Sequence, residues 1–489
     1  METQHISRRR FVKGAFSAIA IAALPARSAL AQSTIWTRLE WQQFRSSPQY
    51  ASFLDAIRLM RANNNAADPS SWRYWTDLHM NAGLHGVPYF LSWHRAYIHH
   101  FEQRLRTVSG NSQLTLPYWD YYKNPNVPAE FTDPSSNNPL YVNRVNTNVY
   151  DSLTLAPFQA SIVNFQRGTS NAFEVLLEWG PHNPVHNIIG GYMAGMDASM
   201  DPIFWLHHCN IDRLWHAWAL PDGKNMPWYT DPYWSGSFNF GSGMSTQRDR
   251  TYHINWMNYH YDDLTRPSTF PPRAEAARMV RVQMQTGRGS RRPAAGAFTP
   301  AGPRDLGGGR RSLGGARNIS LADVSTTVQV PIEAAGRQQL QSALARGAGA
   351  AASGGNGQYR SVRVALESVR MNGQARNGGF YYNVYANLPE DYDAESAQLR
   401  NLLGVIGPFE IAAAEHHGGG NMSFPATGVL AGPAASDARE VSISLVRVGG
   451  RAVQRGQSIS IGEIRVELST EEPNQDGNFI RKPASACYC

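Results

Sequence analysis

Histidines are concentrated in two short parts of this sequence. Residues 85–102 read HGVPYFLSWHRAYIHHFE, and four of these eighteen positions are histidine. A second group follows about ninety residues later, in PHNPVH (181–186) and DPIFWLHHCNID (201–212). Ten of the fifteen histidines lie between residues 79 and 216. Because imidazole is the commonest metal ligand and is seldom so dense in an ordinary core, the pattern favours metal binding over scattered surface positions.

The first group can converge on one point only if the chain is broken between its members. His85 and His94 are nine residues apart, which at about 100° per residue places them on opposite faces of one continuous helix. Val87-Pro88 supplies a break, and Asn81-Ala82-Gly83 is a stop signal after His79. We therefore predict that His79 closes one helix, that His94 opens the next, and that His85 lies on their connection.

The second group begins with a pair at helical spacing. His182 and His186, at i and i+4, share one helix face. The pattern HxxxH also occurs in zinc proteases, but those need Glu directly after the first histidine, where this chain has Asn183. A hydrolase is therefore disfavoured.

A further helix is predicted to begin at Asp201-Pro202, a good N-cap followed by a good first helical residue. His208 and Asp212 lie on it at i and i+4, so we expect Asp212 to orient the His208 imidazole.

Two sets of three imidazoles without carboxylate or thiolate ligands suit copper, since neutral imidazole stabilises both Cu(I) and Cu(II). The residues thus predict two copper ions, and a facing pair of coppers can bind O2.

Both histidine segments resemble a known family. HGVPYFLSWHRAYIHHFE is similar to the first copper signature of tyrosinases and polyphenol oxidases, and DPIFWLHHCNID is similar to the second. The likeness covers about residues 36–270 and implies a binuclear type-3 site with two copper ions and O2 as co-substrate. In that motif His207 is a packed neighbour, and we interpret His99, His100 and His216 as structural. The ligands that the resemblance implies are His79, His85 and His94 for the first copper and His182, His186 and His208 for the second.

The resemblance also implies a reaction. Members of this family oxidise phenols or o-diphenols to o-quinones while O2 is reduced to water, so the expected partners are small phenolic substrates. Two alternatives stay open, a hemocyanin-like O2-binding protein and an o-aminophenol oxidase on the same site.

In the family a Glu and an Asn beside the second copper's first ligand hold a water that deprotonates a monophenol. They match Glu178 and Asn183, with Glu174 as the alternative carboxylate.

Gly195 is expected to shape the substrate pocket. Many diphenol-specific relatives have a bulky residue at this position, whereas glycine leaves room for bulkier or monophenolic substrates. Met196 and Phe204 are expected to line the same pocket. The chain departs from many plant and fungal relatives at Gly83-Leu84, because it lacks the cysteine that forms a thioether with the histidine at position 85.

Composition and charge limit the other classes of function. The 489 residues are 42% hydrophobic and 17% charged, which is ordinary for a globular protein with more than one core. The net charge of +7 arises from residues 273–317, where ten arginines face only Glu275 and Asp305. Because no aromatic platform accompanies these arginines, we expect no nucleic-acid partner. A basic protein that binds polyanions through this segment is the alternative, and it predicts salt-dependent binding.

The N-terminus has the features of an export signal. Ser7-Arg8-Arg9-Arg10-Phe11-Val12-Lys13 resembles the twin-arginine signature, and Ala29-Leu30-Ala31 is a small-residue cleavage site. The apolar run between them is too short for a stable membrane anchor. Residues 1–31 are therefore interpreted as a twin-arginine signal peptide, and the protein is expected to be periplasmic or secreted.

The remaining chain is predicted to form two domains. Residues 32–285 are expected to be a mainly α catalytic domain, a helical bundle around the dicopper site. Residues 286–319 are interpreted as a Gly/Arg-rich linker, and residues 320–489 as an all-β sandwich, because segments such as VRVAL (362–366) and VSISL (441–445) alternate with period two. The stretch from Val362 to Pro389 resembles the C-terminal domain of plant-type polyphenol oxidases. That likeness implies that the domain can shield the active site, and a plain stabilising domain that stays attached is the alternative. The oligomeric state stays open.

Overall fold

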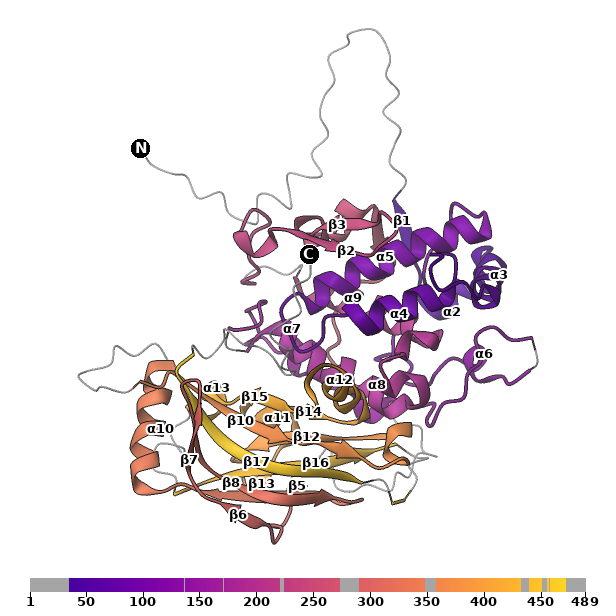
Figure 1. Cartoon of the computed structure of the whole chain (residues 1–489). Coiled ribbons are helices and arrows are strands. Elements are labelled where there is room, and N and C mark those ends of the chain that lie inside the picture. The colour runs from indigo at the N-terminus through magenta and orange to yellow at the C-terminus, as the bar shows by residue number, and fades with distance from the viewer. Residues whose placement is uncertain are drawn as a thin grey trace, which may run out of the picture.

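The computed structural model describes residues 35–135, 137–169, 171–219, 224–272, 290–347, 358–431, 439–450, 455–456 and 458–471. An N-terminal helical region lies beside a C-terminal region of antiparallel sheets (Figure 1). This confirms the predicted order of a mainly α part followed by a β part. The export segment predicted at residues 1–31 lies outside the described residues. No helix within the described ranges is long and apolar enough to cross a membrane.

Four long helices form the bundle that carries most of the histidines: α3 (Gln49–Ala62), α4 (Trp72–Ala82), α5 (Phe90–Ser109) and α9 (Ile203–Ala219). The Ser71 hydroxyl caps α4 by accepting a hydrogen bond from the Arg73 N–H. Between the helices the rings of Phe101 and Trp205 stack with centroids 3.4 Å apart, and Trp75 meets both rings edge-on. This aromatic core holds α4, α5 and α9 in fixed relative positions.

Shorter elements complete the helical region. Trp36–Arg38 forms strand β1 and pairs in parallel with β4 (Tyr259–Tyr261), a partner that no local pattern reveals. The other elements are α2 (Trp41–Phe44), α6 (Ala129–Thr132), α7 (Phe173–Leu177), the π-helical turn η3 (Glu178–His182), α8 (Asn183–Ile189), β2 (Ser237–Asn239) and β3 (Ser245–Gln247). After residue 219 the described part of the helical region consists of short 3-10 turns and two-stranded pairings.

The C-terminal region consists of two antiparallel sheets. The predicted alternating segments lie in its central strands, where Val364 of one strand pairs with Val466 of the next and both side chains are buried. The first sheet has the order β15 (Met422–Pro425), β10 (Ser361–Glu367), β17 (Ile459–Ser469), β8 (Arg310–Leu321), β6 (Thr299–Ala301), with β11 (Arg370–Met371) on β17 and β7 (Arg304–Gly307) on β8. The second has the order β14 (Leu402–Ile406), β12 (Phe380–Ala386), β16 (Glu440–Gly449), β9 (Thr326–Pro331), and a small pair joins β5 (Ser290–Arg291) to β13 (Asp391–Tyr392).

The interpretation of residues 286–319 as a linker is wrong for most of that stretch. Strands β6, β7 and β8 lie within or extend from it, and β8 pairs with β17 along nearly its whole length. Glycine is suited to β8, since a Cβ on Gly315 would lie 2.4 Å from the Ile464 carbonyl oxygen. The arginines are also used, because Arg310 pairs with Glu467 of β17 at 3.3 Å. The glycine- and arginine-rich composition indicated a loop. It could not reveal these pairing partners, because they lie about 150 residues away in the sequence.

Helices of the C-terminal region were not predicted, and one of them reaches the helical region. They are α10 (Ala334–Gly347), α11 (Ala394–Arg400), α12 (Pro408–Gly418) and α13 (Thr427–Leu430). Helix α12 follows β14 directly and lies between the sheets and α8 (Figure 1). Its N-terminus begins at Gly407-Pro408, with proline at the first helical position. This helix therefore forms the seam between the two regions next to the histidines.

Candidate metal centre

Three histidines from two helices and their connection form the first histidine cluster (His79, His85, His94). His79 lies in the last turn of α4, His85 on the loop, and His94 in the second turn of α5, as predicted. The three ring centroids lie 4.9–5.6 Å apart, and each residue offers a nitrogen within 4.8 Å of the others. The helix break at Gly83–Tyr89 thus brings together side chains that one continuous helix would separate.

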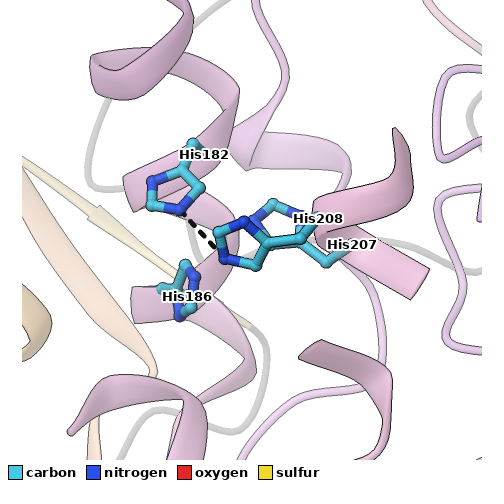
Figure 2. Close-up of side chains that lie close together, drawn as sticks. All are labelled: His182, His186, His207 and His208. Carbon is cyan, nitrogen blue, oxygen red and sulfur yellow. Dashed lines mark hydrogen bonds between the residues drawn. The ribbon is translucent and has the colours of Figure 1, made fainter. Parts of the chain in front are cut away.

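Four histidines form the second histidine cluster (His182, His186, His207, His208). His182 ends η3, His186 lies on α8, and the adjacent pair comes from α9 (Figure 2). One nitrogen of each lies within 4.8 Å of the others, and the Nε2 atoms of His182 and His208 are 3.4 Å apart. Asp201 caps the start of α9 by accepting from the Ile203 N–H at 2.9 Å, as the sequence predicted.

The two histidine clusters face each other across a short gap. The rings of His94 and His208 stack with centroids 4.5 Å apart and 14° between their planes. On the other side of the gap the rings of His85 and His182 are 5.8 Å apart. The family resemblance assigned these side chains to two metal ions, and the fold brings the two sets together around one gap.

Backbone and amide oxygens fix which ring nitrogen faces the gap. The Nδ1 of His94 lies 2.8 Å from the Phe90 carbonyl oxygen, and that of His186 lies 2.8 Å from the Met193 carbonyl oxygen. Because a carbonyl can only accept, Nδ1 carries the proton in both rings and Nε2 keeps its lone pair. These two Nε2 atoms are buried and have no hydrogen-bond partner among the described residues. A buried nitrogen lone pair without a partner is what a metal ion would satisfy, so the donor set fits copper.

Burial also keeps the imidazoles neutral. It lowers the pKa of His79 to about 4 and that of His186 to about 3, and it lowers the pKa of His94, His182 and His208 well below the usual value. Neighbouring imidazoles add to the lowering for the last three. Because only neutral imidazole binds a metal ion, these histidines are ready to act as ligands at neutral pH.

The C-terminal region covers this centre with the side chain of Phe409. Its ring stacks on His186 with centroids 4.2 Å apart and 17° between the planes, and it meets the His85 ring edge-on at 5.3 Å. The backbone N–H of Phe409 donates to the Asn187 Oδ1 at 2.9 Å, which anchors the start of α12 on α8. No sequence signal marked Phe409, because its partner Asn187 is 222 residues away.

Three buried carboxyl groups lie beside the clusters. Glu178 accepts from the Gly86 N–H at 2.5 Å and pairs with Arg167, while Asn187 donates to both oxygens of Glu410 at 3.0 and 3.1 Å. Burial raises the pKa of Glu178, and it raises the pKa of Glu174 and of Glu410 to about 7. The sequence singled out Glu178 and Glu174 but missed Glu410, which comes from the other region.

A small cavity lies between two of these carboxyl groups, Glu178 and Glu410, and His85 of the first cluster. Its volume is about 10 Å³, close to the minimum that holds one water molecule. Glu178 and Asn183, which the sequence paired as holders of a water, both line it, together with Glu410 and Phe409. The Asn183 Oδ1 lies 2.6 Å from the Nδ1 of His182, so this amide also orients an imidazole. Glu174 is not among the residues that line the cavity.

The three residues predicted to line a substrate pocket have different positions. Gly195 lines an open groove of about 670 Å³ at the seam, opposite Arg376 of the C-terminal region. Phe204 is fully buried, with its ring 4.2 Å from His208 and 4.9 Å from His79, so it packs beneath both clusters. Met196 is partly buried against the core. The space directly over the histidines is filled by Phe409 rather than left open beside Gly195.

The prediction that Asp212 orients His208 is wrong. Asp212 accepts instead from Arg95 at 2.5 Å and from the hydroxyls of Tyr259 and Tyr261 at 2.6 Å. A buried carboxylate is stabilised more by a guanidinium than by a neutral imidazole, which explains the preference. Asp212 therefore joins α9 to α5 and β4 and stabilises the bundle behind the clusters.

The histidines interpreted as structural lie outside both clusters. The Nε2 of His100 lies 2.8 Å from the Thr246 hydroxyl, and the Nε2 of His99 lies 2.9 Å from the Gln103 amide. His216 packs against His253 with ring centroids 4.8 Å apart. His207, in contrast, belongs to the second cluster.

Comparison with known proteins agrees with this geometry. Residues 69–152 and 128–220 match the common central domain of tyrosinase. The chain is 33% identical over 212 residues to tyrosinase HcTyr1 of Hahella sp. (strain CCB-MM4), covering 33% of this chain and 46% of that one. It is 27% identical over 226 residues to hemocyanin A-type, units Ode to Odg, of Enteroctopus dofleini, covering 37% of this chain and 18% of that one. The chain thus spans less than half the length of these two curated relatives.

A solved structure extends the likeness to the C-terminal region. Latent aurone synthase (polyphenol oxidase) from natural source superposes with a TM-score of 0.50 at 17% identity, covering 91% of this chain and 93% of that one. At this identity the match shows a shared fold, and it includes the β region as well as the helical bundle. The arrangement of a helical bundle with an appended β region is therefore known in another protein.

Proposed function

We propose that this chain is a type-3 dicopper oxidase that converts phenols or o-diphenols to o-quinones, because residues 69–220 match the common central domain of tyrosinase. The observation that supports this most is the close approach of two buried histidine clusters whose nitrogen lone pairs face a common gap. Copper bound there would supply O2 binding and electron transfer. The proposed ligands are His79, His85 and His94 for one ion and His182, His186 and His208 for the other.

The protein's own residues orient the ligands and exclude water. The Phe90 and Met193 carbonyls hold the rings of His94 and His186 in the tautomer that presents Nε2 to the metal. The surrounding aromatic side chains, including Phe204, exclude water from the clusters, which would limit side reactions of the quinone product with water.

An oxygen carrier is the second candidate, because hemocyanins are among the similar proteins. The carboxyl-lined cavity beside the histidines favours an enzyme, since reversible O2 binding needs no proton acceptor. The test is O2 uptake by copper-loaded protein with tyrosine, catechol and an o-aminophenol, in the wild type and in Phe409→Gly. Quinone formation from any phenol supports the oxidase, and preference for the o-aminophenol identifies the alternative oxidase. Reversible O2 binding without consumption in both proteins would establish the carrier.

Glu178 is proposed to take up the phenol proton through a water held in the small cavity with Asn183. The Glu178→Gln variant keeps the shape of the side chain but lowers its basicity, so we expect monophenol turnover to fall by about 10²-fold or more while diphenol turnover changes little. The matched control is Glu174→Gln, which neutralises a neighbouring buried carboxyl that does not line the cavity. Equal losses on both substrates in Glu178→Gln would mean that Glu178 acts only through its ion pair with Arg167.

The C-terminal region is proposed to act as a shield. Phe409 occupies the space over His186 and His85, where a flat aromatic substrate would have to lie to reach the metal. Polar contacts at the seam, such as the Tyr381 hydroxyl donating to the Asp151 carbonyl at 2.9 Å, accompany the apolar packing of Phe409. Contacts between domains of one chain are in general able to open, and the proposed shield requires this one to do so.

The shielding is expected to weaken as the pH rises from about 4.5 to about 7. Docking buries Glu410 and raises its pKa from the usual 4.5 to about 7, so the docked form holds an extra proton in this window. The docked form is therefore most stable, relative to the undocked form, below pH 4.5. The free energy that favours docking falls by up to roughly 3 kcal/mol by pH 7 and changes little at higher pH. The measurement is catechol turnover of the wild type divided by that of Phe409→Gly, at each pH. This turnover ratio should rise between pH 4.5 and pH 7. It should stay constant with pH when Glu410→Gln is added to both the wild type and Phe409→Gly. A constant ratio without Glu410→Gln would contradict the link between Glu410 ionisation and shielding.

Export by the twin-arginine route is proposed from residues 7–13, which lie outside the described residues. That route carries folded proteins, so copper could be bound before export. Replacing Arg8 and Arg9 together by lysine should leave the protein in the cytoplasm, as fractionation and immunoblotting would show. Unchanged export of this variant would contradict the proposal.

A further inference from the structure

The second histidine cluster contains one imidazole more than the first. His207 and His208 are neighbours on α9, and both face His182 and His186 on the opposite side (Figure 2). The ring centroid of His207 lies 5.2 Å from His182 and 5.0 Å from His186, and the corresponding distances for His208 are 4.9 and 5.7 Å. The pair His182 and His186 is therefore as close to His207 as to His208.

His207 has no other role that the described contacts explain. Its side chain is fully buried, yet neither ring nitrogen has a hydrogen-bond partner in the described part of the chain. Its remaining ring neighbours are the adjacent His208, at 5.3 Å, and Tyr121, at 5.9 Å. Burying a polar group without a partner is unfavourable unless another ligand satisfies it. Burial also lowers the pKa of His207 well below the usual value, so the ring is neutral and has a free lone pair.

The two neighbouring histidines point to different sides of the second cluster. His208 stacks on His94 of the first cluster at 4.5 Å. The ring contacts of His207 are with His182, His186, Tyr121 and His208 itself, and none of them belongs to the first cluster. Adjacent residues of a helix are about 100° apart, which accounts for this divergence. A metal ion on His182, His186 and His207 would thus lie farther from the first cluster than one on His182, His186 and His208.

We propose that His207 provides a second, outer position for the second copper, in which His182, His186 and His207 hold the ion before it moves to His208 beside the first copper. The inference rests on the proposed dicopper function. It implies that the second cluster binds copper without His208. The first cluster has only three histidines among the described residues, so it has no fourth histidine that could replace a lost ligand.

The test compares His208→Ala, His207→Leu and the double variant after metal-free protein is reconstituted with Cu(II). We expect His208→Ala to keep two copper ions per chain, both visible by electron paramagnetic resonance because the outer position separates them. The double variant should keep one copper ion. His207→Leu should bind two, but take up the second several-fold more slowly than the wild type. His100→Leu is the matched control, since His100 is a buried histidine outside both clusters.

Copper content of one ion in both His208→Ala and the double variant would overturn the inference, as would unchanged copper uptake in His207→Leu. Thermal unfolding of each metal-free variant checks that the fold persists, and a wild-type midpoint in His208→Ala makes its copper content decisive. If the wild type itself fails to bind two coppers, the dicopper function fails rather than the role of His207. The two failures are therefore distinguishable.

Discussion

Replacing His94 by alanine is expected to remove one copper ion per chain and to reduce phenol oxidation to the level of the copper-free protein. His94 offers a buried Nε2 whose orientation is set by the Phe90 carbonyl, and its ring stacks on His208 across the gap. Alanine leaves the first cluster with two nitrogens and the opposite cluster without its facing partner. The measurement is copper per chain by atomic spectroscopy, with catechol and tyrosine turnover on the same sample.

The control for this prediction is His100→Ala. His100 lies on the same helix and is mostly buried, but its ring bonds to Thr246 and not to either cluster. This variant should keep two copper ions and the activity of the wild type. If His94→Ala retained both coppers with unchanged turnover, the assignment of the first cluster as a copper site would be wrong.

Replacing Phe409 by alanine is expected to raise catechol turnover of the intact chain several-fold. The ring of Phe409 stacks on His186 at 4.2 Å and meets His85 at 5.3 Å, so its removal opens the space directly over the histidines. Loss of a buried phenylalanine also destabilises a docked region by about 3–5 kcal/mol. Both effects increase access of a planar substrate. Turnover is measured at saturating catechol, with copper content determined in parallel.

A variant of a second phenylalanine distinguishes opening of the site from a general loss of stability of the C-terminal region. Phe380 is fully buried in β12, and its ring meets Tyr382 and Arg447 but, within the described part of the chain, no histidine ring. Phe380→Ala should destabilise the C-terminal region by a similar amount without opening the site. An equal rise in both variants would assign the effect to loosening of the region. Unchanged turnover in copper-replete Phe409→Ala would refute the shielding role of this ring.

Much of the candidate site could be predicted because its information is local. The turn signals at Asn81-Ala82-Gly83 and Val87-Pro88 predicted the break that places His79, His85 and His94 on two helices and a loop. The N-cap signal at Asp201 predicted the helix that carries His208. Period-two alternation likewise predicted β10 and β16. Backbone dihedral preferences and side-chain periodicity act over a few residues, so a single chain displays them.

The errors concern side chains whose partners are distant in the sequence. The i,i+4 spacing correctly placed His208 and Asp212 on one face of α9, but it could not show that Arg95 of another helix lies nearer to the carboxylate. The glycine-rich stretch at 286–319 indicated a loop until its partner β17 was known, since Gly315 is required only where the Ile464 carbonyl approaches it. In both cases the competing interaction becomes visible only after the chain has folded.

The sequence by itself determined the chemistry of this protein: which imidazoles are present, how helix breaks and caps group them, and hence that copper is the metal that suits them. The tertiary structure alone decided what surrounds that chemistry. It placed Phe409 and Glu410, from a region more than two hundred residues later, beside the histidines. It paired Asp212 with Arg95, and it placed His207 beside His182 and His186. The physical reason is that ligand type and helix geometry depend on neighbours along the chain, whereas burial, ion pairing and access depend on which surfaces pack together in space.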